Sequence, residues 1–144
     1  MKLYKLIHIH DIDDFITPDI KRLGYYTSLE KVEESIAFFV SLSGFCDYPN
    51  GFVVTEHEVS YGPHTPKNAV YELCLSVHDK KWDYEYENTI SIHSSRKAAD
   101  DAKRLFKQLN QKDHAIMNCK LIKQIWIDPF YLDEKSEFWS EGFD

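Results

Sequence analysis

The chain has 144 residues and a formal net charge of −7 at pH 7, and 43% of its residues are hydrophobic and 15% aromatic. This length suits one domain or two small ones that share a core, and the mixed charge and ordinary apolar content exclude a disordered chain. No apolar run approaches the ~20 residues that a membrane-spanning helix needs.

The first sixty residues predict a unit with the order strand, strand, helix, strand. Apolar residues predict strands at residues 3–10, 20–26 and 52–59. A polar connection with a Thr-Pro-Asp turn signal separates the first two strands. We assign residues 1–60 to this first unit.

The helix of the first unit begins with a predicted capping box, in which the Thr27 hydroxyl accepts a hydrogen bond from the Glu30 amide. We expect the helix to run to about residue 43 and to end at Gly44, because glycine readily takes a positive φ. Four apolar side chains at helical spacing predict its inward stripe: Val32, Ile36, Phe39 and Leu42.

A linker with prolines and a glycine, residues 61–68, leads to a second unit at residues 69–128. Ser94 or Ser95 caps the helix of this unit. Residues 129–144 form an acidic and aromatic tail. The second unit has predicted strands at residues 70–77, 82–93 and 119–128 and a helix at 96–110, whose inward residues are Ala99, Ala102, Phe106 and Leu109.

The two units resemble each other at a constant offset of 67 residues (71 minus 4). Conservative pairs such as Leu23 and Ile90 fill one gapless register. An internal repeat of this kind indicates that the same arrangement of strands and helix occurs twice in the chain. The identical residues are Tyr4, Leu6, Ser28, Phe39 and Leu42, which recur as Tyr71, Leu73, Ser95, Phe106 and Leu109.

These patterns predict an α+β fold, compact as a whole, with two strand-strand-helix-strand units. The two helices pack on one face of a mixed sheet, or of two abutting sheets. A right-handed crossover through each helix makes the second and third strands of a unit parallel, and the first strand pairs with the second as an antiparallel hairpin.

Three motifs carry a resemblance to a known family: residues 24–28 (GYYTS), residues 44–52 (GFCDYPNGF) and residues 139–143 (WSEGF). Together they resemble a family of small bacterial domains with a Gly-x-Tyr-Ser/Thr-Ser helix start, a GFxDYPxGF loop and a closing W-S/T-EGF. The resemblance implies a compact bacterial domain and no particular activity. This chain departs from the single-copy pattern, because the second unit lacks the loop and precedes the closing motif.

The loop motif also has a physical interpretation. Pro49 and the Asn50-Gly51 pair are typical of a tight turn, and Phe45 and Phe52 on either side of it predict a clamp onto the core.

Charge and cysteine usage limit the partners and the compartment. Residues 128–144 carry six acids and one lysine, a net charge of −5, and the other residues carry −2. An acidic surface repels phosphate backbones and attracts basic proteins, so we expect no direct nucleic-acid binding. Cys46, Cys74 and Cys119 form no CxxC and predict reduced thiols in the cytoplasm. The first residues lead directly into a strand, so we expect neither a secretory leader nor a membrane anchor.

A weak metal candidate lies at the end of the first strand. His8 and His10 project to one face of a strand and could share a metal, and Asp11 or Asp13 could add an oxygen ligand. The alternative is two strand-end histidines before a solvated acidic turn. The chain contains no GxSxG and no phosphate-binding glycine loop, so we expect no cofactor and no catalysis.

The strongest candidate for a binding surface is the stretch 82–87, where aromatic and acidic residues alternate. In a strand one face would be aromatic and the other acidic. Aromatic anchors dominate interface energetics, and carboxylates speed association with a cationic partner. Alternatively, the aromatic face is internal core. With the acids of the tail, the predicted partner-binding residues are Trp82, Asp83, Tyr84, Glu85, Tyr86, Glu87, Asp133, Glu134 and Glu137.

The sequence therefore favours a non-catalytic protein-binding module, most concretely an immunity protein that neutralises a basic, nuclease-like toxin by occlusion. The alternatives are a small metal-dependent enzyme that uses His8, His10 and Asp11, and a small-ligand sensor. An exposed edge strand in either unit could pair with a partner or with a second copy in a homodimer.

Overall fold

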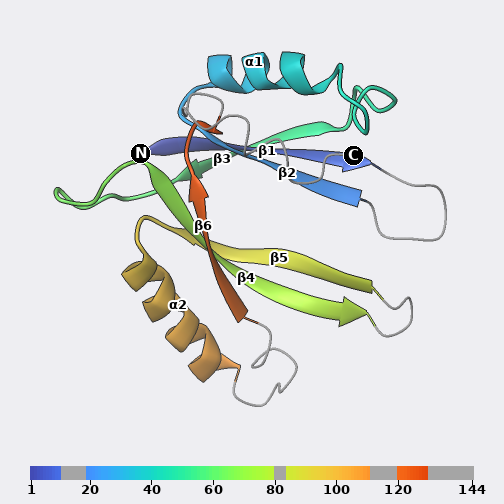
Figure 1. Ribbon diagram of the computed structural model, residues 1–144. Helices are drawn as coiled ribbons and strands as arrows, with labels where there is room; N and C mark the ends of the chain where they lie inside the picture. The colour runs from blue at the N-terminus through green and yellow to red at the C-terminus, as the bar shows by residue number, and fades with distance from the viewer. Residues whose placement is uncertain (11–18, 80–83, 111–119, 130–144) are drawn as a thin grey trace. The chain divides into compact units, whose positions relative to one another are not determined.

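The structure is a computed structural model, and its contacts divide the chain into two units (Figure 1). The first unit comprises Lys2–Glu58 and Trp126–Asp144, and the second comprises Met1 and Val59–Ile125. The residues described are 1–10, 19–79, 84–110 and 120–129.

Each unit contains one three-stranded sheet, and the α+β class is confirmed. In the first unit the strand order is β2-β1-β3, and in the second it is β5-β4-β6. The strands are β1 (Lys2–His10), β2 (Asp19–Tyr26), β3 (Phe52–Glu58), β4 (Ala69–Asp79), β5 (Tyr84–His93) and β6 (Lys120–Trp126).

Both sheets are antiparallel, so the expectation of a mixed sheet is wrong. β2 and β3 each pair antiparallel with β1 and therefore run in the same direction, as the crossover rule requires. The central position of β1 keeps these two strands apart. The same strand order in the second unit places β4 between β5 and β6.

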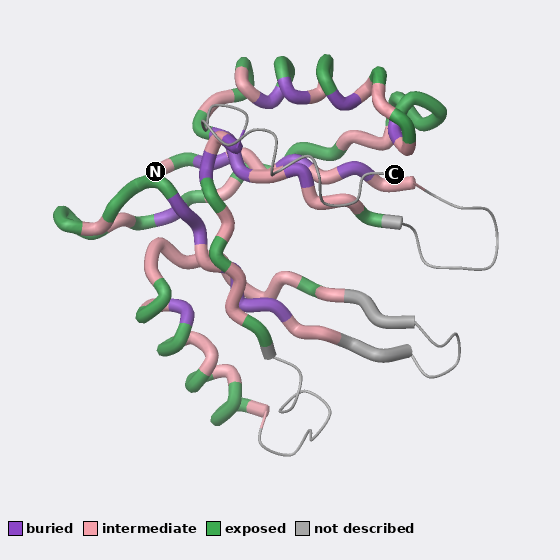
Figure 2. Tube along the Cα trace, in the orientation of Figure 1, coloured by how far each residue is buried: buried purple, intermediate pink, exposed green. Residues whose placement is uncertain are grey.

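The helices cover their own sheets: α1 (Leu29–Phe39) packs against β1 and β2, and α2 (Arg96–Leu109) packs against β4 and β5. Figure 2 shows buried and exposed residues alternating along α1, as the predicted stripe requires. The prediction for Leu109 is wrong, because this side chain is 74% exposed. Successive residues of a helix are about 100° apart around its axis, so Leu109, ten residues after the buried Ala99, lies about 80° away from it and outside the buried face.

Both helices begin at a serine. The Ser28 side chain accepts a hydrogen bond from the Lys31 amide at 3.2 Å, and Ser95 accepts one from the Ala98 amide at 3.1 Å. The predicted capping box at Thr27 is therefore wrong by one residue. α1 ends at Phe39, earlier than expected, and turns carry the chain to Gly44, which has a φ of 87°.

Each hairpin contains a bulge at the corresponding position. In the first hairpin Leu6 faces Gly24 and Ile7 faces Arg22, so that the fully buried Leu23 is the extra residue. The second hairpin shifts register at the same offset of 67 (73 minus 6): Leu73 faces Ser91 and Cys74 faces Thr89. The two hairpins share this geometry, while the proposed repeat of the sequence stays a prediction.

The core of the first unit lies between α1 and its sheet. Its fully buried members come from both strands of the hairpin, from α1 and from the loop that follows the helix. They are Leu6, Leu23, Tyr26, Val32, Phe39 and Phe45, with Tyr4, Ile36, Leu42 and Phe52 packed against them.

Candidate functional site

Five of the nine predicted partner-binding residues lie outside the part of the chain that the structure describes. They are Trp82, Asp83, Asp133, Glu134 and Glu137. Tyr84, Glu85 and Tyr86 belong to β5, where they face Asp79, His78 and Val77 of β4.

Glu87 is the one predicted partner-binding residue whose side chain the structure describes. The Lys123 ammonium lies 2.5 Å from its carboxylate, and this lysine comes from β6. Because β4 separates β5 from β6, the ion pair spans the width of the sheet. The negative charge of Glu87 is thus partly balanced by Lys123 within the same unit.

His8 is a structural residue of the first unit. Its side chain is fully buried, and its Nε2 lies 2.9 Å from the Tyr48 carbonyl oxygen. A carbonyl only accepts hydrogen bonds, so Nε2 carries the proton and donates. Within the part of the chain that the structure describes, Nδ1 has no hydrogen-bond partner. The Phe45 and Phe52 rings contact the imidazole with their centroids 4.9 and 4.8 Å away.

The loop of residues 44–52 closes over this histidine. The Ile9 amide donates to the Gly51 carbonyl at 2.8 Å. A Cβ at Gly51 would lie 2.5 Å from the Ile9 carbonyl oxygen and 2.7 Å from His8 Nε2, so no other residue fits without a shift. In this geometry the loop is a clamp on the end of β1, as its turn chemistry predicts.

This packing bears on the metal hypothesis. The His10 ring lies against the Tyr48 ring, with centroids 3.6 Å apart, and His8 already binds the Tyr48 carbonyl. Asp11 and Asp13 lie outside the described residues. Within the described ranges there is no group of three or more His, Cys, Asp or Glu side chains that could hold a metal ion.

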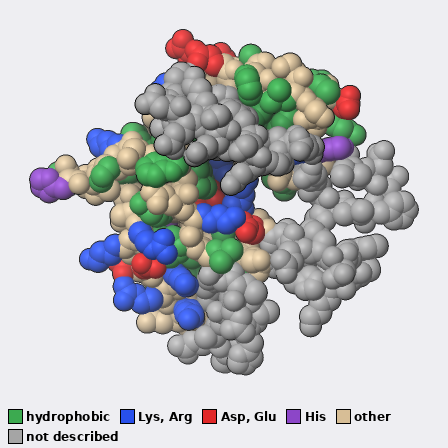
Figure 3. All heavy atoms as spheres, in the orientation of Figure 1, with side chains coloured by type: hydrophobic (Ala, Val, Ile, Leu, Met, Phe, Trp, Pro, Cys, Tyr) green, Lys and Arg blue, Asp and Glu red, His purple; other side chains and the backbone are tan. Residues whose placement is uncertain are grey.

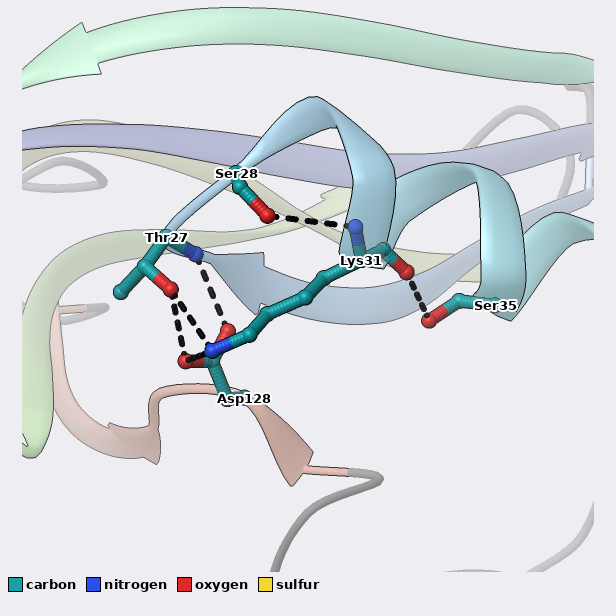
Figure 4. A network of polar contacts seen from close by, with 5 residues as sticks. All are labelled: Thr27, Ser28, Lys31, Ser35 and Asp128. Carbon is teal, nitrogen blue, oxygen red and sulfur yellow. Dashed lines mark hydrogen bonds and ion pairs between the residues drawn. The ribbon is translucent and has the colours of Figure 1, made fainter.

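A polar network fixes the residues after β6 to the start of α1 (Figure 4). The Asp128 carboxylate accepts hydrogen bonds from the Thr27 amide at 3.0 Å and from the Thr27 hydroxyl at 2.8 Å. The Lys31 ammonium lies 2.8 Å from the same carboxylate. A carboxylate at a helix N-terminus also interacts favourably with the helix dipole.

The backbone reinforces this attachment. The Asp128 amide donates to the Tyr25 carbonyl at 2.8 Å, and Ile127 forms an isolated parallel bridge with Tyr25. Pro129 approaches Gly24, where a Cβ would lie 3.0 Å from the proline ring. The sequence analysis missed Asp128, although the Asp-Pro dipeptide is a turn signal that marks the position.

A buried carboxylate in the second unit was also missed. Glu72 of β4 is fully buried, and both the Thr89 hydroxyl, at 3.3 Å, and the Cys74 thiol, at 3.6 Å, donate to its Oε2. Period-two alternation places Glu72 and Cys74 on the same face of β4. A cysteine is often buried, but a glutamate is rarely buried unless it is paired, so the sequence does not signal the burial of Glu72.

Among the described residues, β3 is an edge strand of the first sheet with no neighbour on its outer side. Four consecutive residues, Val53, Val54, Thr55 and Glu56, are exposed, and the strand is mostly green in Figure 2. Exposure on both faces of a strand rich in β-branched residues is unusual for a member of a packed sheet. It marks β3 as the most accessible described strand of the first unit.

The pairing pattern shows which backbone groups face outward. The Ile9 amide bonds to the Gly51 carbonyl, and Met1 and Val59 exchange two hydrogen bonds of 2.6 and 2.9 Å. The register between these two points contains no bulge. Because hydrogen-bonded pairs alternate in an antiparallel ladder, the amides and carbonyls of Val54 and Glu56 point away from β1.

Comparison with known proteins returned no match to a protein-family model, a curated protein or a solved structure. The resemblance to the bacterial domain family stays a prediction. No helix in the described part of the chain has the length and apolar character needed to cross a membrane.

Proposed function

We propose that this protein is a non-catalytic protein-binding module that adds an extended strand of its partner to the open edge of β3. The observation that carries the proposal is the exposed run from Val53 to Glu56, together with the outward direction of the Val54 and Glu56 backbone groups. Main-chain hydrogen bonds along such an edge supply affinity, and the alternate side chains supply specificity.

The charge of the chain supports a basic partner. The net charge of −7 raises the rate of association with a cationic protein. In its most concrete form the proposal is an immunity protein that occludes a basic toxin domain. The acidic and aromatic residues at 82–87 and in the tail are the predicted second part of that interface.

The test uses Val54→Pro, with Val54→Ala as its matched control. Proline removes an amide that points away from β1, so the pairing of β3 with β1 is retained. Alanine shortens the same side chain and keeps the amide. Tagged wild-type and variant proteins are used to capture partners from the source organism, and the affinity of any captured basic protein is then measured in purified form.

We expect the affinity for the partner to fall by about tenfold or more with Val54→Pro, because proline removes one hydrogen bond to the partner strand and its ring prevents that strand from approaching closely. The affinity should fall much less with Val54→Ala, which keeps the amide. Equal affinity for all three proteins would reject the β3 edge as the binding site. Melting temperatures of both variants show whether the fold is intact.

A second variant tests the acidic strand separately. Glu85→Lys is the better probe than Glu87→Lys, because Glu87 already pairs with Lys123 and its reversal would disturb the second sheet. We expect Glu85→Lys to slow association and to make it less sensitive to salt. An unchanged association rate would remove residues 82–87 from the proposed interface.

A further inference from the structure

The two helices occupy corresponding positions in their units but carry opposite charge. The outward side of α1 carries the exposed residues Glu30, Glu33 and Glu34. In Figure 3 red side chains gather at the start of α1, whereas mostly blue side chains, with a few red ones among them, lie over α2. The cations of α2 are Arg96, Lys97, Lys103, Arg104 and Lys107.

The cations of α2 are largely unbalanced. They line a shallow hollow together with one acid, Asp100. Arg104 forms an ion pair with Asp101. Within the described ranges, Arg96, Lys97 and Lys107 have no carboxylate partner. The helix thus presents a positive strip on a chain whose net charge is negative.

Both helices also expose large apolar side chains beside their charges. Leu29 and Phe38 on α1 are 51% and 44% exposed, and Leu105 and Leu109 on α2 are 57% and 74% exposed. Exposed ion pairs alone contribute little to association. Apolar side chains next to complementary charges provide the additional contact area that a specific contact needs.

We propose that the outward face of α1 in one molecule docks on the outward face of α2 in a second copy of this chain. Each chain carries both the acidic surface and its basic complement, so a second copy satisfies the charge of both helices without another partner. The two surfaces differ, so two copies satisfy both helices only when the contact is made reciprocally in a dimer, and a contact made once joins molecules head to tail into a ring or a longer chain. This inference is independent of the β3 edge.

Sedimentation velocity of the wild-type protein tests the proposal first. We expect concentration-dependent association at about 0.05 M salt that weakens by tenfold or more at about 0.5 M, because salt screens exposed charges. A protein that remains monomeric up to about 1 mM at low salt would overturn the proposal.

Two charge-reversed variants identify the surfaces. One carries Glu30→Lys and Glu33→Lys on α1, and the other carries Lys97→Glu and Lys107→Glu on α2. All four residues are exposed. In each variant the two helix faces have charge of the same sign, so we expect each variant alone to associate at least tenfold more weakly than the wild type.

An equimolar mixture of the two variants restores complementary charge between molecules. We expect the mixture to associate about as strongly as the wild type, with the two variants alternating in the assembly. A mixture that stays as weakly associated as its components would reject the α1–α2 contact. Circular dichroism and melting temperature confirm that each variant is folded, and the wild-type salt dependence tests the proposal without any variant.

Discussion

At the scale of single residues, His8 shows how one side chain ties the sheet to a loop. It is fully buried, its Nε2–H donates to the Tyr48 carbonyl, and two phenylalanine rings enclose it. Replacing it removes both the hydrogen bond and the packing, which leaves a polar carbonyl and a cavity behind.

We predict that His8→Ala lowers the free energy of unfolding by about 2–4 kcal/mol, as large-to-small core substitutions do. His10→Ala is the control, because His10 is only half-buried and contacts Tyr48 through its ring alone. Urea unfolding measures the free energy of unfolding of both variants. Equal, small effects of the two substitutions would contradict the structural role. Zinc-dependent stabilisation of the wild type that is lost in His8→Ala would instead favour the metal site.

Tyr26 gives a prediction on pH. Its hydroxyl donates to the Leu23 carbonyl at 2.8 Å in the core, and burial raises the pKa of the phenol. A phenol with a raised folded-state pKa contributes stability that is fully present below the unfolded pKa of about 10 and is lost as the pH rises above it.

We therefore expect the free energy of unfolding to fall above about pH 10, with Tyr26 contributing up to about 1.4 kcal/mol per pH unit. Tyr26→Phe should be less stable at pH 7, because the hydrogen bond is lost, and should show a shallower alkaline slope. Identical slopes for the two proteins between about pH 10 and 11 would show that Tyr26 ionises without opposing folding.

At the scale of elements, the structure depends on chain segments held in place by a few polar contacts. The loop after α1 is fixed by His8 and by the lack of a Cβ at Gly51. The segment after β6 is fixed by Asp128, which bonds to Thr27 and Lys31 at the start of α1.

We predict that Asp128→Ala lowers the free energy of unfolding by about 1–3 kcal/mol, because two hydrogen bonds and a partly buried ion pair are lost together. Asp101→Ala is the matched control, since its ion pair with Arg104 is exposed and worth about 0–1 kcal/mol. Thermal unfolding of the two variants distinguishes them. A smaller effect at Asp128 than at Asp101 would contradict the attachment.

At the scale of the whole molecule, the sequence predicts the local elements better than their pairing. Periodicity correctly predicts α1, its inward residues Val32 and Phe39, and the strands around them. It cannot show that β1 lies between β2 and β3, because strand order depends on contacts between residues distant in sequence. The cap of α2 at Ser95 agrees with the prediction, whereas the cap of α1 at Ser28 differs from the predicted Thr27, since Asp128 engages Thr27 from a distant part of the chain.

The candidate site is less predictable still. The outward direction of the Val54 and Glu56 backbone groups depends on the register with β1, which no local pattern encodes. The exposure of β3 likewise follows from its position at the edge of the sheet. The charge contrast between α1 and α2 is visible in the sequence, but only their placement at corresponding positions of two similar units gives it meaning.

The most direct test of the open edge is amide hydrogen exchange along β3, measured by NMR in the free protein and in the presence of a captured partner. We predict that the Val54 and Glu56 amides exchange much faster than the Val53 and Thr55 amides in the free protein, and that the partner slows the fast pair. Val54 and Glu56 amides that are already as protected as their neighbours in the free protein would show that the edge is closed, and would contradict the proposed function.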